Sequence, residues 1–253
     1  MTDPHDALFR YALRLGDDSL VLGQMLGEWC GHAPTLEVDL ALANLALDLI
    51  GQATHLLDYA GEVEGAGRDG DALAFHRDVL DFANCLLVEQ PNGDFARTIM
   101  RQFLFSLWRK GLLEALCEST DATLAGVAKK AIKETRYHLR FAAEWVVRLG
   151  DGTDESHARA ADALDWCWRF VDELFEADVV TEALVAEGIA PDPAALRAAF
   201  DKELDRVLAE ATLERPAARR GVVGGRSGRH SEHLGHILSE MQFLPRAYPG
   251  AAW

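Results

Sequence analysis

Apolar positions along this chain recur every three or four residues, and the strict alternation that marks β-strands is almost absent. The segments with this spacing are long and rich in alanine and leucine, which favour helices. The pattern therefore predicts an all-α fold. Helices are expected over approximately Asp6–Cys30, Thr35–Ala60, Ala72–Val88, Phe95–Glu118, Ala122–Leu149, Glu155–Glu187, Pro193–Glu210 and Ser231–Arg246.

Glycine and proline separate these segments. Thr35 is placed to cap the second helix, and Gly150 is placed at the end of the fifth, where glycine is favoured. Two glycine-rich stretches, Gly61–Asp71 and Arg215–Arg229, are expected to be loops.

The four longest helices are expected to have about 24 to 30 residues, which corresponds to about 36 to 45 Å at 1.5 Å per residue. Such lengths are typical of a ferritin-like four-helix bundle, in which one long crossover joins two helical hairpins. The helix expected over Ala72–Val88 lies where that crossover belongs. Because the sequence has no internal repeat and no interdomain linker, residues 1–253 are interpreted as a single ferritin-like domain with additional helices.

The chain has 253 residues and a formal net charge of −16. Such a charge repels phosphate backbones, so nucleic-acid binding is not expected. The four cysteines form no Cys-x-x-Cys pair, which disfavours a zinc site and fits a reducing cytoplasm. No basic region leads into an apolar stretch at the N-terminus, and charges are expected to interrupt each hydrophobic segment before the ~20 residues of a membrane span. The sequence predicts a soluble cytoplasmic protein without a membrane partner.

The second expected helix is apolar on nearly every side, which is typical of a buried helix. Its polar exceptions, Asn44, Asp48, Gln52 and His55, have spacings that place them on one face. A buried carboxylate such as Asp48 is destabilising unless it is paired, hydrogen-bonded or bound to a metal. This stripe therefore needs partners from other helices.

Two other helices offer such partners. Glu134 and His138 lie one turn apart in the fifth helix, and Glu28 lies near the end of the first. Inward carboxylates and imidazoles on facing helices are what a metal site in a bundle requires. The same side chains also suit a buried hydrogen-bond network or ordinary ion pairs, which is the favoured interpretation of each residue alone.

A carboxylate-bridged di-iron site in this fold takes two Glu-x-x-His motifs and one glutamate from each remaining helix. The sequence contains no Glu-x-x-His, because Gly51 follows Asp48 at the third position and Tyr137 follows Glu134. We therefore expect neither a catalytic residue nor a metal ligand in this chain. A degenerate metal-site face is predicted instead, formed by Glu28, Asp48, Gln52, Glu134 and His138.

Three histidines near the C-terminus, His230, His233 and His236, are spaced three residues apart. On a helix the third lies well away from the first, so one metal ion would be held poorly by all three. A structural or interface role is favoured over a bound cation.

Four arginines lie in a glycine-rich loop of this otherwise acidic chain: Arg219, Arg220, Arg226 and Arg229. Guanidinium groups and backbone N–H groups in such a loop suit a phosphate. Contact with an acidic partner in an assembly, or simple solvation, is favoured over phosphate binding.

Five segments carry a resemblance to a known family: LRLGDDSLVLGQMLGEWCGHAP, EVDLALANLALDLIGQA, LLVEQPNGDFARTI, AIKETRYHLRF and HSEHLGHILSEMQFLPRAYPGAAW. They resemble the C subunits of bacterial phenylacetyl-CoA epoxidase (ring 1,2-epoxidase), the PaaC family. Together they span nearly the whole chain. The resemblance implies a ferritin-like fold and a place in the multicomponent monooxygenase of aerobic phenylacetate breakdown.

In that family a related A subunit holds the di-iron centre and epoxidises the aromatic ring. A reductase subunit supplies electrons from NADPH through flavin and an iron–sulfur cluster. The resemblance implies that this chain is a structural partner of the di-iron A subunit, within a larger hetero-oligomer that includes the reductase, and binds no cofactor itself. Glu28, Asp48, Glu134 and His138 match only the degenerate ligand face of the family.

Two alternatives stay open. The chain could be a di-iron or other metal-dependent oxidase in its own right, with atypical ligands around Glu28, Asp48, Glu134 and His138. It could also be a storage or binding protein that holds a small ligand in the bundle cavity. The sequence leaves open whether the chain is itself an enzyme.

Overall fold

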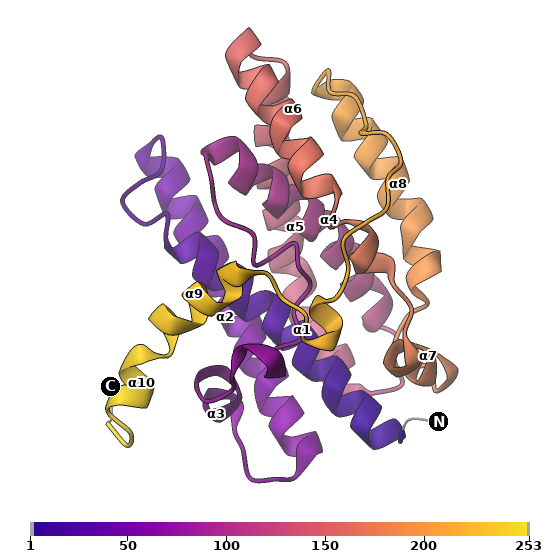
Figure 1. The fold of residues 1–253 in the computed structure, drawn as a ribbon. Helices are drawn as coiled ribbons and strands as arrows, with labels where there is room; N and C mark the ends of the chain where they lie inside the picture. The colour runs from indigo at the N-terminus through magenta and orange to yellow at the C-terminus, as the bar shows by residue number, and fades with distance from the viewer. Residues whose placement is uncertain (1–2, 252–253) are drawn as a thin grey trace. The chain divides into compact units, whose positions relative to one another are not determined.

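A computed structural model describes residues 3–251, which form helices joined by loops (Figure 1). The α-helices are α1 (Pro4–Gly27), α2 (Leu36–Glu64), α3 (Gly70–Phe75), α4 (Phe95–Leu116), α5 (Ala122–Gly150), α6 (Asp154–Trp168), α7 (Val179–Ala186), α8 (Pro193–Glu210), α9 (Glu232–Met241) and α10 (Phe243–Ala247). Short 3₁₀ helices are η1 (Val79–Asp81), η2 (Asp172–Phe175) and η3 (Gly225–Ser227). No β-strand occurs within residues 3–251, and the predicted all-α fold class is confirmed.

The chain divides into two compact units. The first consists of Met1–Pro91 and Gly224–Trp253, and the second of Asn92–Val223. Each unit contains one pair of long helices, α1 with α2 and α4 with α5, as a ferritin-like bundle requires. The interpretation of residues 1–253 as one domain stays a prediction.

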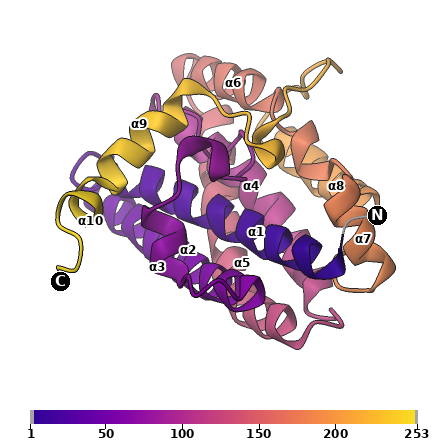
Figure 2. The same ribbon diagram turned by 60° about the horizontal axis from the view of Figure 1, so that its bottom comes forward.

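In the first unit α1 and α2 run side by side in opposite directions (Figures 1 and 2). Thr35 caps α2 as predicted, because its side-chain oxygen accepts a hydrogen bond from the first turn. Two glycines of α1 allow the close approach. A Cβ on Gly16 would lie 2.7 Å from Leu57 Cδ2, and one on Gly23 would lie 3.2 Å from the Ala46 carbonyl oxygen.

The second helix is longer than expected and continues to Glu64. Gly65 ends it in the left-handed conformation, with φ of 68°, which glycine adopts without strain. The loop predicted over Gly61–Asp71 is therefore correct only in its middle, since α2 includes its first residues and α3 its last.

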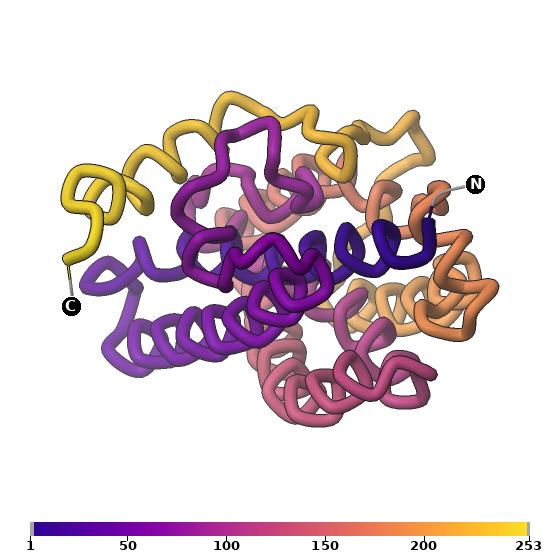
Figure 3. Tube along the Cα trace, turned by 90° about the horizontal axis from the view of Figure 1, so that it is seen from below, coloured from indigo at the N-terminus to yellow at the C-terminus, as the bar shows by residue number. Residues whose placement is uncertain are grey.

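The helix predicted over Ala72–Val88 is wrong. The connector between α2 and α4 contains only the short α3 and η1 and is otherwise irregular where it lies beside α1 (Figure 3). The Ala83 amide donates a hydrogen bond to Asp17 (2.9 Å), and the Cys85 amide donates one to Asp18 (2.7 Å). A helix would use these N–H groups internally, so the buried carboxylates of α1 override the local helical pattern.

In the second unit α4 and α5 form the other antiparallel pair, with bounds close to those predicted. Phe95 at the start of α4 packs edge-on against Trp145 near the end of α5, with ring centroids 5.0 Å apart. Glu114 near the end of α4 is 3.1 Å from Arg136 in the middle of α5. The helices α6 and α8 pack against α4.

The single helix predicted over Glu155–Glu187 is wrong in its middle, where η2 separates α6 from α7. The Arg169 carbonyl oxygen accepts a hydrogen bond from the Val222 amide (2.7 Å) in place of a helical one. Asp178 starts α7 afresh, because its side chain accepts a hydrogen bond from the Thr181 amide (2.9 Å).

The helix predicted over Ser231–Arg246 is also interrupted, at Gln242. The Gln242 side-chain amide donates hydrogen bonds to the carbonyl oxygens of Ala74 and Arg77, both at 3.0 Å. Pro245, which has no N–H group, disfavours a continuous helix through this point. The remaining helix prediction, over Pro193–Glu210, is confirmed as α8.

Within residues 3–251, α2 alone is long and apolar enough, by length and composition, to cross a membrane. Its most apolar window has a mean hydropathy of 1.3 and is half buried, and the core helix of a soluble protein passes the same test. Asp48 is the only Asp, Glu, Lys or Arg from Leu40 to Leu57. That single carboxylate interrupts the apolar segment, so the expectation that charges interrupt each hydrophobic segment before about 20 residues holds for α2 only through Asp48.

Candidate functional site

The five residues of the predicted degenerate metal-site face are divided between the two units. Glu28 is the exposed C-cap of α1, Asp48 is half-buried in α2, and Gln52 is buried one turn further on. In the second unit Glu134 is half-buried and His138 is buried, one turn apart on α5. Each of the five has a partner within the chain.

The other two residues of the stripe predicted on α2, Asn44 and His55, are exposed. A step of four residues rotates about 40° around a helix, so positions at this spacing drift across its surface. Asn44 therefore lies nearer the outer side of α2 than Gln52 does. The expectation that all four side chains point to partners in the interior is wrong for Asn44 and His55.

The donor set of this face does not fit a di-iron centre. Such a centre needs imidazoles one turn after two of its glutamates, whereas this face has a single imidazole, His138, and an amide at Gln52. Glu28 lies at an exposed helix end. In the part of the chain that the structure describes, no group of three or more His, Cys, Asp or Glu side chains could hold a metal ion.

The three C-terminal histidines have different environments. The His230 side chain is buried against Glu89, His233 is half-buried, and His236 is exposed. None of the three belongs to a cluster of His, Cys, Asp or Glu side chains within residues 3–251 that could hold a metal ion.

Two adjacent aspartates in the middle of α1, Asp17 and Asp18, are completely buried. Asp17 is paired with Arg77 of the connector, which is buried too, with one N–O distance of 3.0 Å. Asp18 accepts hydrogen bonds of 3.0 and 2.8 Å from Arg226. Buried carboxylates are tolerated when a charged partner and further donors surround them, and the connector amides described above complete the set. Sequence reasoning missed this cluster, although two adjacent acids inside an apolar helix are a signal for it.

A third buried acid of the first unit, Glu89, is paired with His230. Nδ1 of His230 is 2.7 Å from Glu89, and Nε2 is 2.8 Å from the Phe82 carbonyl oxygen. Both ring nitrogens face acceptors, so both carry protons and the ring is an imidazolium. Burial lowers the pKa of His230, but the hydrogen bonds to Glu89 and to Phe82 outweigh it and raise the pKa above its ordinary value.

These contacts change the interpretation of the arginine loop. Arg226 is largely buried and paired with Asp18, so it is not the phosphate or partner contact predicted for it. Arg219 is exposed and lies 3.0 Å from Asp165. Arg220 and Arg229 are exposed. For Arg219, Arg220 and Arg229 the contact with a phosphate or a partner stays a prediction.

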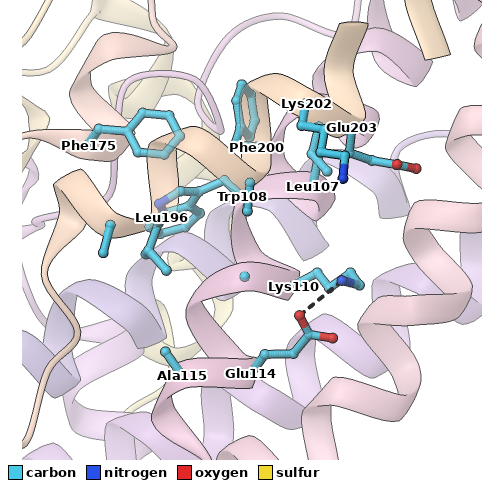
Figure 4. Close-up of a pocket in the computed structure, with 13 residues that line it drawn as sticks. Leu107, Trp108, Lys110, Glu114, Ala115, Phe175, Leu196, Phe200, Lys202 and Glu203 are labelled. Carbon is cyan, nitrogen blue, oxygen red and sulfur yellow. Dashed lines mark hydrogen bonds and ion pairs between the residues drawn. The ribbon is translucent and has the colours of Figure 1, made fainter. Parts of the chain in front are cut away.

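The second unit contains a cleft of about 600 Å³ between α4 and α8, called here the α4–α8 cleft (Figure 4). Its lining residues are Leu107, Trp108, Lys110, Gly111, Glu114, Ala115, Phe175, Ala195, Leu196, Ala199, Phe200, Lys202 and Glu203. The aromatic side chains gather at one end and the charged side chains at the other (Figure 4). Sequence reasoning did not identify this cleft, because it depends on how α8 returns to α4.

The outer side of α2 carries four exposed apolar side chains, called here the outer stripe. They are Leu36, Leu40, Leu47 and Ile50, which are 71%, 56%, 66% and 39% exposed. Ile50 lies at the edge of the stripe next to α1, where its Cγ1 would be 3.1 Å from a Cβ on Gly23. The spacing of the four side chains places them within a narrow arc along four turns of the helix. Contiguous apolar surface of this kind marks an interaction site more often than an isolated leucine does.

Long antiparallel helix pairs and buried acid–base pairs define an all-α protein with the helix pairing of a bundle. The chain belongs to the family described as phenylacetic acid catabolic protein, which matches residues 1–253. It is 54% identical over 246 residues to the C subunit of 1,2-phenylacetyl-CoA epoxidase from Escherichia coli (strain K12), covering 97% of this chain and 99% of that protein. The resemblance drawn from the sequence segments is confirmed.

Proposed function

We propose that this chain is a non-catalytic, structural subunit of a multicomponent phenylacetyl-CoA epoxidase in aerobic phenylacetate catabolism. Its role is to bind and support the di-iron catalytic A subunit. The chain itself supplies no catalytic residue and holds no cofactor. The likeness to the C subunit of such an epoxidase over nearly its whole length supports this assignment.

The observation that carries the proposal is the outer stripe of α2. Leu36, Leu40 and Leu47 are each more than half exposed, although leucine transfer to water is unfavourable by about 1.5–3 kcal/mol per side chain. No Asp, Glu, Lys or Arg lies in the arc between them. Burial of this stripe against helices of the catalytic subunit would stabilise both chains, and we assign the stripe to that contact.

The acid–base chemistry of the chain is consistent with a supporting role. Its fully buried carboxylates, Asp17, Asp18 and Glu89, are occupied by Arg77, Arg226 and His230. These pairs hold the connector and the C-terminal segment onto α1. They give a rigid body on which a partner can be positioned, in place of ligands poised for a metal.

The assembly we propose is a larger hetero-oligomer that includes the reductase subunit and works in the cytoplasm, with neither nucleic acid nor membrane as a partner. The formal charge of −16 supports the exclusion of nucleic acid. Half of the most apolar window of α2 is buried, which supports its interpretation as a helix that packs against protein and not against lipid.

The test is co-purification of the chain with the catalytic subunit. The variant Leu40→Asp/Leu47→Asp places two carboxylates in the outer stripe and is expected to weaken the complex by at least a hundredfold, since each buried charge opposes burial of the surface. Val179→Asp, at a 65% exposed apolar position in the first turn of α7, is the matched control and should leave the complex intact. Equal complex formation by both variants would show that the stripe is not the contact.

A further inference from the structure

We propose that the α4–α8 cleft is a binding site for a small amphipathic carboxylate, with the apolar part of the ligand between α4 and α8 and its carboxylate at Lys202. This inference goes beyond the supporting role and does not depend on it. It rests on the size of the cleft, the separation of its apolar and charged ends, and the pairing of its charges.

The apolar end is formed by aromatic side chains. Phe175 and Phe200 pack edge-on with ring centroids 5.0 Å apart, and Trp108 and Leu196 lie beside them (Figure 4). A volume of about 600 Å³ is within the usual range of small-molecule sites, which are lined mainly by apolar and aromatic groups with a few polar ones. This end suits a ring or a short acyl chain.

Small residues on both helices keep the cleft open. Gly111 and Ala115 lie one turn apart on α4, and Ala195 and Ala199 lie one turn apart on α8. A Cβ added to Gly111 would meet only Leu196 Cδ2, at 3.9 Å, which is ordinary van der Waals contact. The space above Gly111 is therefore not filled by neighbouring side chains.

At the charged end both glutamates already have cationic partners. Lys110 and Arg136 bind Glu114, at 3.0 and 3.1 Å. Burial raises the pKa of the Glu114 carboxyl, but these two hydrogen bonds outweigh it and lower the pKa below its ordinary value. Glu114 is therefore ionised and already paired with two cationic side chains.

Glu203 is occupied in the same way by Arg206, which donates hydrogen bonds of 3.1 and 2.8 Å. The hydrogen bonds from Arg206 lower the pKa of Glu203. Four charged side chains line the cleft. Among them, the Lys202 ammonium makes no hydrogen bond or ion pair within residues 3–251. The free charge at this end is thus positive, which favours an anionic ligand group over a cationic one.

A carboxylate fits this end better than a phosphate group does. One exposed ammonium suits a single negative charge, whereas phosphate sites gather several N–H donors, from a helix N-terminus or from arginine forks. The first turn of α8 contributes Ala195 to the lining, but the amides of Ala194 and Ala195 already donate hydrogen bonds to the cap residue Asp192. The guanidinium groups of Arg136 and Arg206 are likewise bound, to Glu114 and Glu203.

The experiment is isothermal titration of the full-length chain with phenylacetate and with octanoate, each compared with its uncharged primary amide. Both acids are expected to bind saturably. The dissociation constants of the amides should be about fivefold higher, as expected for the loss of one partly exposed ion pair of about 1 kcal/mol. Lys202→Gln should raise the dissociation constant of the acids about fivefold to tenfold. The exposed Lys133 of α5 is the matched control, and Lys133→Gln should leave binding unchanged.

A second variant tests the apolar end. Gly111→Leu fills the floor of the cleft and should remove binding of both acids, while its helical circular dichroism stays that of the parent chain. Three results would each overturn the proposal: no saturable binding of either acid up to about 10 mM, equal binding by the Lys202→Gln and Lys133→Gln variants, or undiminished binding by Gly111→Leu.

Discussion

Nδ1 of His230 lies 2.7 Å from the carboxylate of Glu89, and neither side chain is more than 1% exposed. The pair joins the C-terminal segment to the last residues of the connector. Because the second ring nitrogen faces the Phe82 carbonyl oxygen, the ring donates two hydrogen bonds only when it is protonated. One of the contacts that attach residues 224–251 therefore depends on a proton.

The first prediction concerns pH. The pKa of His230 is raised in the folded chain, so the stabilisation is fully present below its ordinary value of 6.5 and is lost as pH rises through the higher folded value. Amide hydrogen exchange of α9, corrected for the intrinsic pH dependence, should show weaker protection at pH 9 than at pH 6. His230→Gln should abolish the difference, and His236→Gln, at an exposed position, should retain it. Protection of α9 that is independent of pH in the parent chain would contradict the imidazolium assignment.

The second prediction compares a buried and an exposed ion pair. Arg226→Met leaves the carboxylate of Asp18, which is 0% exposed, without its cation and should lower the free energy of unfolding of the first unit by about 3 kcal/mol or more. Arg219→Met removes the exposed pair with Asp165 and should change it by less than about 1 kcal/mol. Denaturant titration measures both, and Asp18→Asn in the Arg226→Met background should recover part of the loss. Equal effects of the two arginine variants would mean that the buried pair is not structural.

The third prediction uses two glycines of the same helix. A Cβ on Gly61 would lie 2.1 Å from the Arg68 carbonyl oxygen, whereas one on Gly51 would meet nothing within 4 Å. Gly51→Ala should stabilise the chain by about 0.5–1 kcal/mol, because alanine restricts the unfolded chain and favours helix. Gly61→Ala should destabilise it by about 1–3 kcal/mol, since the backbone after α2 has to move. Thermal unfolding followed by circular dichroism distinguishes the two signs.

Long-range contacts explain which parts of the fold could be predicted from the sequence. Thr35 and the bounds of α4, α5 and α8 were predicted correctly, because caps and helical periodicity are local properties. The connector has a local helical pattern too, yet Asp17 and Asp18, more than sixty positions away, bind its amides. Tertiary contacts of that kind leave no periodic signal.

The candidate site, like the fold, could be predicted only in part from the sequence. Spacing alone indicated that Gln52 and His138 would be buried, and they are. Spacing did not indicate that Arg226 would be buried and bind Asp18, 208 positions away in the sequence. The sign of a charge shows that it needs a partner, but only the fold shows which one. The α4–α8 cleft is of the same nature, since small residues on two distant helices leave no motif.

The last prediction concerns iron. The predicted ligand face supplies one imidazole, His138, where a di-iron centre of this fold requires two at one-turn spacing after glutamate. The isolated chain, refolded with ferrous iron and passed through a desalting column, should therefore retain well below one iron per chain by mass spectrometry. The complex with the catalytic subunit should retain iron, and its content should be the same when this chain carries Asp48→Asn or His138→Gln, provided that both variants still form the complex. Two irons per isolated chain, lost on either substitution, would instead establish this chain as a metal oxidase with atypical ligands. A loss of iron from the complex on His138→Gln alone would place a ligand of the shared assembly in this chain, and the supporting role would then have to include the metal.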